Sequence, residues 1–290
     1  MTFKKRMMMT TLASSILLLN ACGQTSEEEP SPDETAQEEV NQNEESQTTE
    51  EPDDDDRTEV DEDLNGSSTS GNEDDEQSDS VDKEMPQLDL EGDILEPASF
   101  SVLVNKQYSL PEDYVPENLV TVEVPTVLPN PEIKQMRQVA ADALKEMFDA
   151  AETSGIILHA RSGYRSYQTQ VQLFNNYVNS HGEEAANKYS ARPGESEHQT
   201  GLVMDVTSES VGLQLTEEFG NTEEGTWVSN NAHEFGFIIR YLEGKEDITG
   251  YVYEPWHIRY LGPELATDVF ESGLSYEEYL IDRGINIEIQ

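Results

Sequence analysis

Two of the five histidines in this chain lie beside carboxylates in polar, glycine-containing surroundings. His198 lies in the stretch Ser-Glu-His-Gln-Thr-Gly, seven residues before Asp205, and His257 follows Glu254 by three residues. A catalytic zinc site takes three protein ligands of the His, Asp or Glu type and leaves a further position open for water. His198, Asp205 and His257 can supply those three ligands.

Glu254 can act beside such a site without being a ligand. Three residues before His257, it can take a proton from a water molecule whose pKa zinc lowers to about 7. Many soluble domains contain a similar set of His, Asp and Glu residues. Spacing alone therefore makes the zinc site a hypothesis and does not establish it.

Other catalytic arrangements fit the sequence less well. The penicillin-binding type of serine peptidase needs Ser-x-x-Lys, and beyond the N-terminal region that pattern occurs only at 80–83, inside an acidic low-complexity stretch. The chain has no Gly-x-Ser-x-Gly motif. His233-Glu234 begins like a His-Glu-x-x-His metalloprotease helix, but Phe237 stands where the second histidine is required.

The elements around these residues can be predicted from apolar periodicity. Residues 131–153 show near-helical spacing and are followed by Gly155, and a second helix is expected from Ser166. The tail should hold two short helices, the second opened by Ser275 with Glu278 three residues later, as in a capping box. Further predicted elements are strands at 156–158, 202–204, 237–239 and 256–260, a loop at 190–201 and a helix at 222–235. This order predicts an α+β fold: a single domain with a small, mainly antiparallel sheet flanked by helices.

The first 22 residues predict export. A basic region at 4–6 precedes a largely apolar stretch at 7–19, which is shorter than the about 20 residues that cross a bilayer but suits a signal peptide. The stretch ends in Leu-Asn-Ala-Cys, which resembles the lipobox of bacterial lipoproteins. This resemblance implies lipidation of Cys22 and an extracytoplasmic protein anchored to the outer face of the cell membrane. An ordinary signal peptide with an incidental cysteine is the alternative.

Residues 23–97 form a strongly acidic stretch that contains 30 Asp or Glu, two basic residues and no aromatic residue. Such a segment buries too little apolar surface to offset its conformational entropy, which predicts a disordered tether. Residues 98–290 have a usual size for one domain. With 12 Lys or Arg and 31 Asp or Glu they carry a net charge of −19, which argues against a nucleic-acid partner. Nothing in the sequence requires a dimer, so a monomer is expected.

Several linked motifs resemble the VanY/LdcB family of D-alanyl-D-alanine carboxypeptidases. They are Ser-Gly-Tyr-Arg-Ser-Tyr at 162–167, Ser-Glu-His-Gln-Thr-Gly-Leu-Val-Met-Asp-Val at 196–206, the stretch 232–241 and Glu-Pro-Trp-His-Ile-Arg-Tyr at 254–260. The resemblance covers about half of residues 98–290 and keeps the family's order. Linked motifs in the family's order are far more specific than any one of them.

The resemblance implies a role for each matching residue. It makes His198, Asp205 and His257 the ligands of one Zn2+ per chain and Glu254 the general base. It further implies that Arg165 stabilises the oxyanion and that three residues bind substrate: Gln170, Ser196 and Tyr241. Alternatives remain for three residues. Arg165 could have only the structural role of bridging its loop to a carboxylate, and Tyr241 could only pack against its neighbours. Glu197 could replace one of the ligands.

The resulting expectation is a zinc-dependent D,D-carboxypeptidase that removes the C-terminal D-alanine from peptidoglycan stem peptides. Two alternatives stay open at this stage. The chain could be an L,D-carboxypeptidase acting on tetrapeptide stems, because the family includes both specificities. It could also be a wall-binding lipoprotein without catalysis, although the complete set of ligands and base argues against that.

Overall fold

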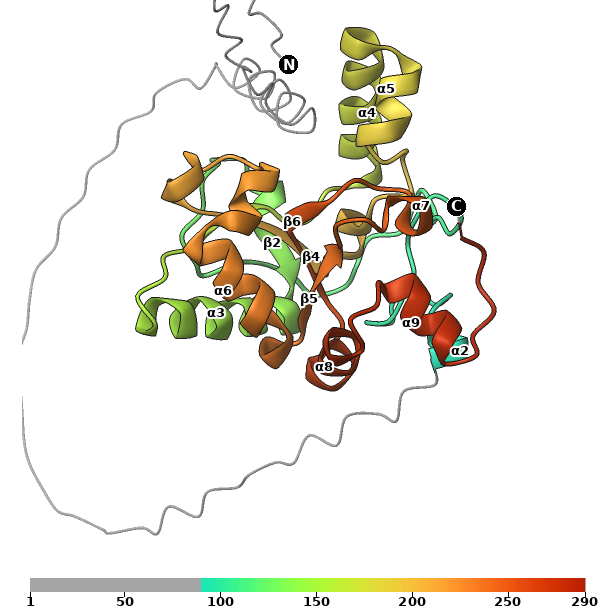
Figure 1. The fold of residues 1–290 in the computed structure, drawn as a ribbon. Coiled ribbons are helices and arrows are strands. Elements are labelled where there is room, and N and C mark those ends of the chain that lie inside the picture. Colours follow the sequence, from blue (N-terminus) through green and yellow to red (C-terminus); the bar gives the residue numbers. More distant parts are fainter. Residues whose placement is uncertain (1–89, 290) are drawn as a thin grey trace, which may run out of the picture.

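The computed structural model describes residues 90–289 (Figure 1). The predicted signal peptide, Cys22 and most of the predicted tether lie outside the described residues. The described part begins with helix α2 (Leu90–Asp93), and Ile94 is buried in a hydrophobic cluster with Leu103 and Leu261. The packed part of the chain therefore starts before Ala98, the residue at which the sequence predicted the domain to begin.

A four-stranded antiparallel sheet forms the centre of the fold. Its strand order is β3 (His159–Ser162), β4 (Val203–Thr207), β6 (Glu254–Tyr260) and β5 (Phe237–Tyr241). A second, two-stranded antiparallel sheet pairs β1 (Leu119–Thr121) with β2 (Gln135–Arg137). The predicted α+β class with a small antiparallel sheet is confirmed.

Helices surround the central sheet. They are α3 (Gln138–Thr153), α4 (Tyr167–His181), α5 (Glu183–Tyr189), α6 (Glu223–Asn231), α7 (Glu246–Thr249), α8 (Pro263–Ser272) and α9 (Tyr276–Asp282). Short 3-10 turns lie at Glu132–Lys134, Glu197–Thr200, Glu209–Val211, Glu217–Asn221 and Ala232–Phe235. In Figure 1, α4 and α5 form a helical pair that projects from the rest of the domain.

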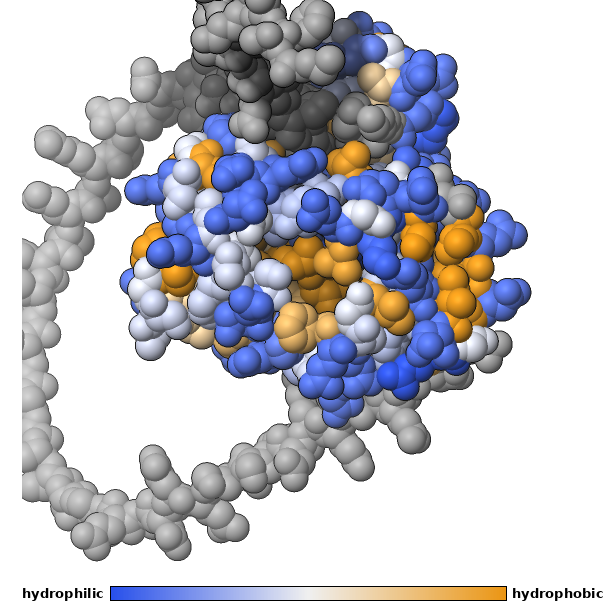
Figure 2. Space-filling model, in the orientation of Figure 1, coloured by the Kyte–Doolittle hydropathy of each residue, from blue (hydrophilic) through white to orange (hydrophobic). Residues whose placement is uncertain are grey.

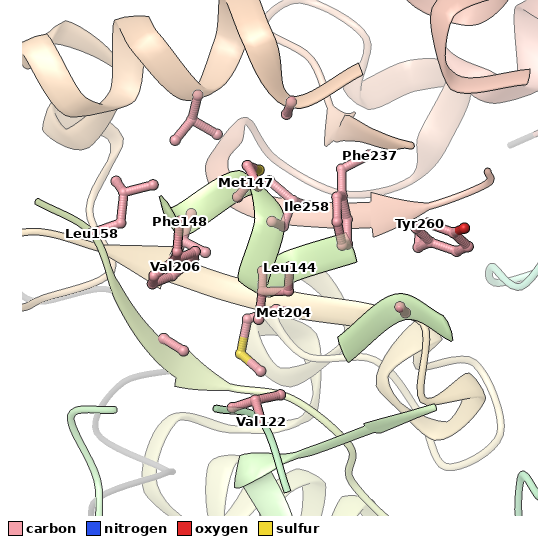
Figure 3. Close-up of a cluster of buried hydrophobic side chains, with 14 of the residues drawn as sticks. Val122, Leu144, Met147, Phe148, Leu158, Met204, Val206, Phe237, Ile258 and Tyr260 are labelled. Atoms are coloured by element: carbon pink, nitrogen blue, oxygen red, sulfur yellow. The ribbon is translucent and has the colours of Figure 1, made fainter. Parts of the chain in front are cut away.

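The largest hydrophobic core lies between α3 and one face of the central sheet. Leu144 and Met147 of α3 pack with Met204 of β4 and Ile258 of β6, and all four are fully buried (Figure 3). Side chains alternate between the two faces of a strand. Burying Met204 and Ile258 on this face therefore directs their neighbours Asp205 and His257 to the opposite face.

Residues 98–114 form an arm that wraps across the domain. Arg259 donates hydrogen bonds from Nη2 to the carbonyl oxygens of Phe100 (2.9 Å) and Val102 (2.8 Å). The hydroxyl of Tyr276 donates to the carbonyl oxygen of Ser101 at 2.5 Å. The arm is thus held by buried side chains that come from far along the sequence.

Several local predictions are confirmed. Ser166 caps α4 by accepting a hydrogen bond from the amide of Thr169, and Ser275 with Glu278 forms the predicted capping box of α9. Gly236 ends the helical stretch with a φ of 86°, a left-handed conformation that glycine adopts without steric cost.

Other local predictions are wrong. Residues 132–137 were expected to be helical, but they form a 3-10 turn and then strand β2, because β1 pairs with this segment. Strand β3 begins at His159, after the predicted strand 156–158, and Ile157 is exposed. Strand β4 continues to Thr207, beyond the predicted strand 202–204, so Asp205 lies in its middle.

The surface is mostly hydrophilic on the face shown in Figure 2, with an apolar hollow where α6 and α8 flank β5. Among the described residues, no helix is both long and apolar enough to span a bilayer.

Candidate metal centre and active site

The three predicted metal ligands come together beside the face of β4 and β6 that is turned away from the main core. Nε2 of His198 lies 3.4 Å from Oδ2 of Asp205, and Nδ1 of His257 lies 3.2 Å from Oδ1 of the same carboxylate. Asp205 and His257 face each other in the register of β4 and β6, and His198 reaches them from the 3-10 turn Glu197–Thr200. All three side chains are buried.

A glycine backbone orients His198. Nδ1 of His198 lies 2.7 Å from the carbonyl oxygen of Gly163, so this nitrogen donates its proton to the carbonyl and Nε2 keeps its lone pair. A Cβ on Gly163 would lie 2.5 Å from the carbonyl oxygen of Gln135. Glycine is therefore required here for the close passage of the two backbones that places the carbonyl behind His198.

His257 faces the cluster with its Nδ1, whereas His198 does so with its Nε2. Nδ1 of His257 faces Asp205, and Oε2 of Glu254 is 3.4 Å from the same nitrogen. Nε2 of His257 points the other way, to Oε2 of Glu197 at 3.4 Å. Glu254 thus stands beside the cluster at the start of β6, where its side chain retains 15% of its exposure.

Burial and charge shift the ionisation of these groups. Burial lowers the pKa of His198, and the positive charge of Arg165 lowers it further, to about 3. Burial also acts to lower the pKa of His257, but contacts with Asp205 and Glu197 outweigh it and raise the pKa to about 9. Burial would raise the pKa of Asp205, yet the two histidines and Arg165 hold it below its usual value. Asp205 is therefore an anion at neutral pH.

Arg165 reaches the same carboxylate from the loop after β3. Its Nη2 lies 3.9 Å from Oδ2 of Asp205, and its Nη1 donates a hydrogen bond to Oε1 of Gln170 at 3.3 Å. The amide of Gln170 in turn donates to the carbonyl oxygen of Ala191 at 2.8 Å. Gln170, which was expected to bind substrate, is thus also the residue that aligns Arg165 and ties α4 to the loop before Ser196.

A pocket opens over this cluster and collects all the predicted site residues except Asp205. Its lining includes Arg165, Gln170, Ser196, His198, Tyr241, Glu254 and His257. A register shift in β5 between Ile239 and Tyr241 turns Tyr241 toward the site. Its ring lies 4.8 Å from that of His257 and 4.8 Å from that of Tyr251. Tyr241 therefore both packs against a candidate ligand and lines the pocket.

Sequence reasoning missed two features of the pocket. Tyr251, which completes its aromatic wall, was not singled out, and Glu197 was considered only as a substitute ligand. Glu197 is instead held by Arg240 and Arg259, whose side chains are as fully buried as its own. The sequence did contain a signal: Arg259 stands two residues after His257 on the same strand and must share its face.

The remaining singled-out residues lie outside the cluster. Trp256 belongs to the core, and His181 is the last residue of α4. His233 stacks on Phe270 with ring centroids 3.9 Å apart. Nδ1 of His159, at the start of β3, is buried without a hydrogen-bond partner among the described residues.

The cluster fits a zinc ion. Both carboxylate oxygens of Asp205 are buried and accept no well-formed hydrogen bond within residues 90–289, an arrangement that is costly unless a cation is bound. One ligand atom from each of His198, Asp205 and His257 lies within 4.8 Å of the others. Ligand atoms at about 2.1 Å in a tetrahedral zinc site are about 3.4 Å apart, close to the separations found here.

The fold and the site together are those of a hydrolase with a candidate metal centre: an α+β domain with a buried His-Asp-His cluster beneath a pocket that also holds a carboxylate and an arginine. A family model described as VanY, D-alanyl-D-alanine carboxypeptidase, matches residues 133–263. The chain belongs to this family.

Relatives and solved structures agree with that assignment. The chain is 51% identical over 187 residues to the "Putative carboxypeptidase YodJ" of Bacillus subtilis (strain 168), covering 64% of this chain and 68% of that protein. It is 36% identical to a D-alanyl-D-alanine carboxypeptidase of Enterococcus faecalis, covering 62% of this chain and 65% of that protein.

Two solved structures are similar to the fold. The LdcB LD-carboxypeptidase matches with a TM-score of 0.62 and 50% identity over 64% of this chain and 87% of that one. A mutant of the D,D-pentapeptidase VanY from a VanB-type resistance cassette, in complex with Zn(II), matches with a TM-score of 0.50 and 36% identity. It covers 62% of this chain and 97% of that one.

Proposed function

We propose that this chain is a zinc-dependent D,D-carboxypeptidase that removes the C-terminal D-alanine from peptidoglycan stem peptides. The observation that carries the proposal is the buried cluster of His198, Asp205 and His257 beneath a pocket that also contains Glu254 and Arg165. Family membership supports the reaction type, and the Zn(II) complex of a VanY relative supports the metal.

His198, Asp205 and His257 would hold one zinc ion per chain. When bound at such a site, zinc supplies Lewis acidity, which polarises a carbonyl group and lowers the pKa of water. His198 and His257 bring neutral imidazole nitrogens and Asp205 a negative charge, so the protein leaves a net positive centre for an electron-rich oxygen.

Different side chains would then carry out the proton transfers and stabilise the developing charge. Glu254 takes a proton from the attacking water and later gives it to the leaving amine of D-alanine. Arg165, aligned by Gln170, faces the negative charge that develops on the scissile carbonyl oxygen. Ser196, Tyr241 and the second hydrogen of the Gln170 amide are available to bind the end of the stem peptide. Hydrolysis consumes one water and yields the shortened stem and free D-alanine.

L,D-specificity is the second candidate, and one observation favours it. The LdcB structure, described as an LD-carboxypeptidase, matches this chain with 50% identity, whereas the VanY structure matches with 36%. An enzyme of that specificity would remove D-alanine from tetrapeptide stems with the same zinc, base and arginine. The proposed location is the outer face of the cell membrane, reached through a lipid on Cys22.

Defined muropeptides distinguish these possibilities. The full chain is incubated with pentapeptide or tetrapeptide stems, with added zinc or with a chelator, and mass spectrometry follows the loss of one alanine. Loss from the pentapeptide alone, abolished by the chelator, supports the D,D-carboxypeptidase. Loss from the tetrapeptide alone assigns L,D-specificity. No loss from either by folded, zinc-loaded protein contradicts the enzymatic function and supports a wall-binding role.

A further inference from the structure

Glu197 lies directly behind His257, on the side away from the other candidate ligands. Its Oε2 is 3.4 Å from Nε2 of His257, while Nδ1 of the same ring faces Asp205 at 3.2 Å. Both Oε2 of Glu197 and Nε2 of His257 are buried, and neither makes a well-formed hydrogen bond to any described residue, so the 3.4 Å contact between them is the close polar contact of both atoms. Each of these two atoms is therefore the available partner of the other.

The other oxygen of Glu197 is fixed by two arginines. Oε1 accepts hydrogen bonds from Nε of Arg240 at 2.8 Å and from Nη1 of Arg259 at 2.6 Å. All three side chains are completely buried. A carboxylate anchored in this way cannot swing forward to become a metal ligand, which answers the question that the sequence left open about Glu197.

The arginines are themselves held in place. Arg240 makes a two-pronged pair with Glu277, from Nη1 to Oε2 at 2.8 Å and from Nη2 to Oε1 at 2.6 Å. Arg259 is tied to the arm through two carbonyl oxygens. Two arginines and two glutamates thus balance their charges inside the domain. The position of Oε2 of Glu197 is set by a rigid network that spans β5, β6, α9 and the arm.

This placement determines which nitrogen of His257 can bind a metal. A hydrogen on Nε2 pointing to Glu197 leaves the lone pair of Nδ1 directed at the cluster. For His198 the two nitrogens have the opposite roles: the carbonyl oxygen of Gly163 accepts the hydrogen on Nδ1, and the lone pair of Nε2 is directed at the cluster. Partners of this kind fix the tautomer and ring orientation of metal-binding histidines, and their loss costs about 10- to 100-fold in metal affinity or activity.

We infer that Glu197 is a positioning residue of the metal centre: it fixes the Nε2–H tautomer and the ring orientation of His257. The inference rests on the proposed function, in which His257 is a zinc ligand. The fully buried carboxylate of Glu197 acts on the metal through His257.

The experiment compares two substitutions in the full chain. Glu197→Gln and Glu277→Gln each remove one buried carboxylate from the same network and each leave Arg240 with one anionic partner, but only Glu197 contacts His257. Zinc affinity is measured by competition with a chelator. The geometry of the metal site is followed by the visible spectrum of the Co2+-substituted protein, and folding by thermal unfolding.

The expected result separates positioning from stability. Glu197→Gln should weaken zinc binding about 10- to 100-fold and shift the Co2+ spectrum. Glu277→Gln keeps Glu197 and its direct hydrogen bonds from Arg240 and Arg259, so it should destabilise the fold and change both metal readouts much less. Equal losses of zinc affinity in the two variants, or unchanged affinity in Glu197→Gln, would overturn the inference. A wild-type chain that binds no zinc would instead refute the proposed function.

Two further measurements cover the case in which Glu197→Gln does not fold. Glu197→Asp keeps the negative charge beside both arginines but withdraws the carboxylate from His257 by one methylene. It should weaken zinc binding in the same direction. In 15N NMR of the zinc-loaded wild-type chain, His257 should be protonated at Nε2 and His198 at Nδ1. Protonation of His257 at Nδ1 would contradict the inference without any substitution.

Discussion

Asp205 and His257 lie directly opposite each other on the antiparallel strands β4 and β6, with Oδ1 of the first 3.2 Å from Nδ1 of the second. The adjacent pair, Met204 and Ile258, is buried in the main core on the opposite face. A slip of one residue in this register would turn one of the two ligands into the core. The packing that stabilises the sheet therefore also assembles the site.

Replacing a ligand should remove the metal. His198→Ala deletes the Nε2 that faces Asp205 and should reduce tightly bound zinc from one equivalent per chain to almost none, as measured by elemental analysis after dialysis. His233→Ala is the matched control, because His233 stacks on Phe270 outside the site and should keep its zinc. Tight binding of one equivalent by His198→Ala would refute the ligand assignment.

Replacing the base should separate binding from turnover. Glu254→Gln preserves the shape of the side chain beside His257 but cannot accept a proton. We expect kcat to fall about 10²- to 10⁴-fold while zinc content and thermal unfolding stay unchanged. The measurement is release of D-alanine from a stem peptide at saturating zinc. Turnover close to wild type would show that another group is the base.

Replacing the arginine tests oxyanion stabilisation. Lysine in Arg165→Lys keeps the charge but cannot contact both Asp205 and Gln170 with a planar fork. A loss of about 10²- to 10³-fold in kcat is expected, with zinc affinity close to wild type. If zinc affinity fell in parallel with kcat, Arg165 would be a structural bridge to Asp205.

The metal-free protein should lose stability as the pH rises through neutrality. The carboxylates of Asp205 and Glu197 outweigh the effect of burial and raise the pKa of His257 from 6.5 to about 9 in the folded state. The folded protein thus binds this proton more tightly than the unfolded chain. That contribution is complete below pH 6.5 and is lost as the pH rises to about 9.

Two measurements check this pH dependence. The unfolding temperature of chelator-treated protein should fall between pH 6.5 and 9, and zinc affinity should rise over the same interval because zinc displaces the proton of His257. The pKa of His198 is about 3, so its effect on stability lies below this interval. An unfolding temperature that rises from pH 6.5 to 9 would contradict the prediction.

Detaching the arm should destabilise the domain. Tyr276→Phe removes the buried donor to the carbonyl oxygen of Ser101 and should cost about 1–3 kcal/mol, because that carbonyl is left without a partner. Tyr108→Phe is the control: its hydroxyl accepts a hydrogen bond from the exposed amide of Glu288, so a smaller loss is expected. Denaturant unfolding measures both, and equal losses would contradict the role given to the arm.

Much of the local structure could be predicted from the sequence, because the signals are local. Ser166 and Ser275 cap helices through contacts with residues three positions along the chain, and Gly236 ends a helical stretch because glycine adopts a positive φ easily. The segment 132–137 could not be predicted in this way. Its apolar spacing suits a helix, but pairing with β1 makes part of it a strand.

The residue types and spacing in the sequence determined which side chains could form the metal site, since only a few His, Asp and Glu residues stand together in polar motifs. Tertiary structure alone decided how they are held. Glu197 meets Arg240, Arg259 and His257 across 43 to 62 residues of chain, and Gly163 meets His198 across 35. Such contacts leave no local pattern, because they depend on how strands pair and which faces they bury.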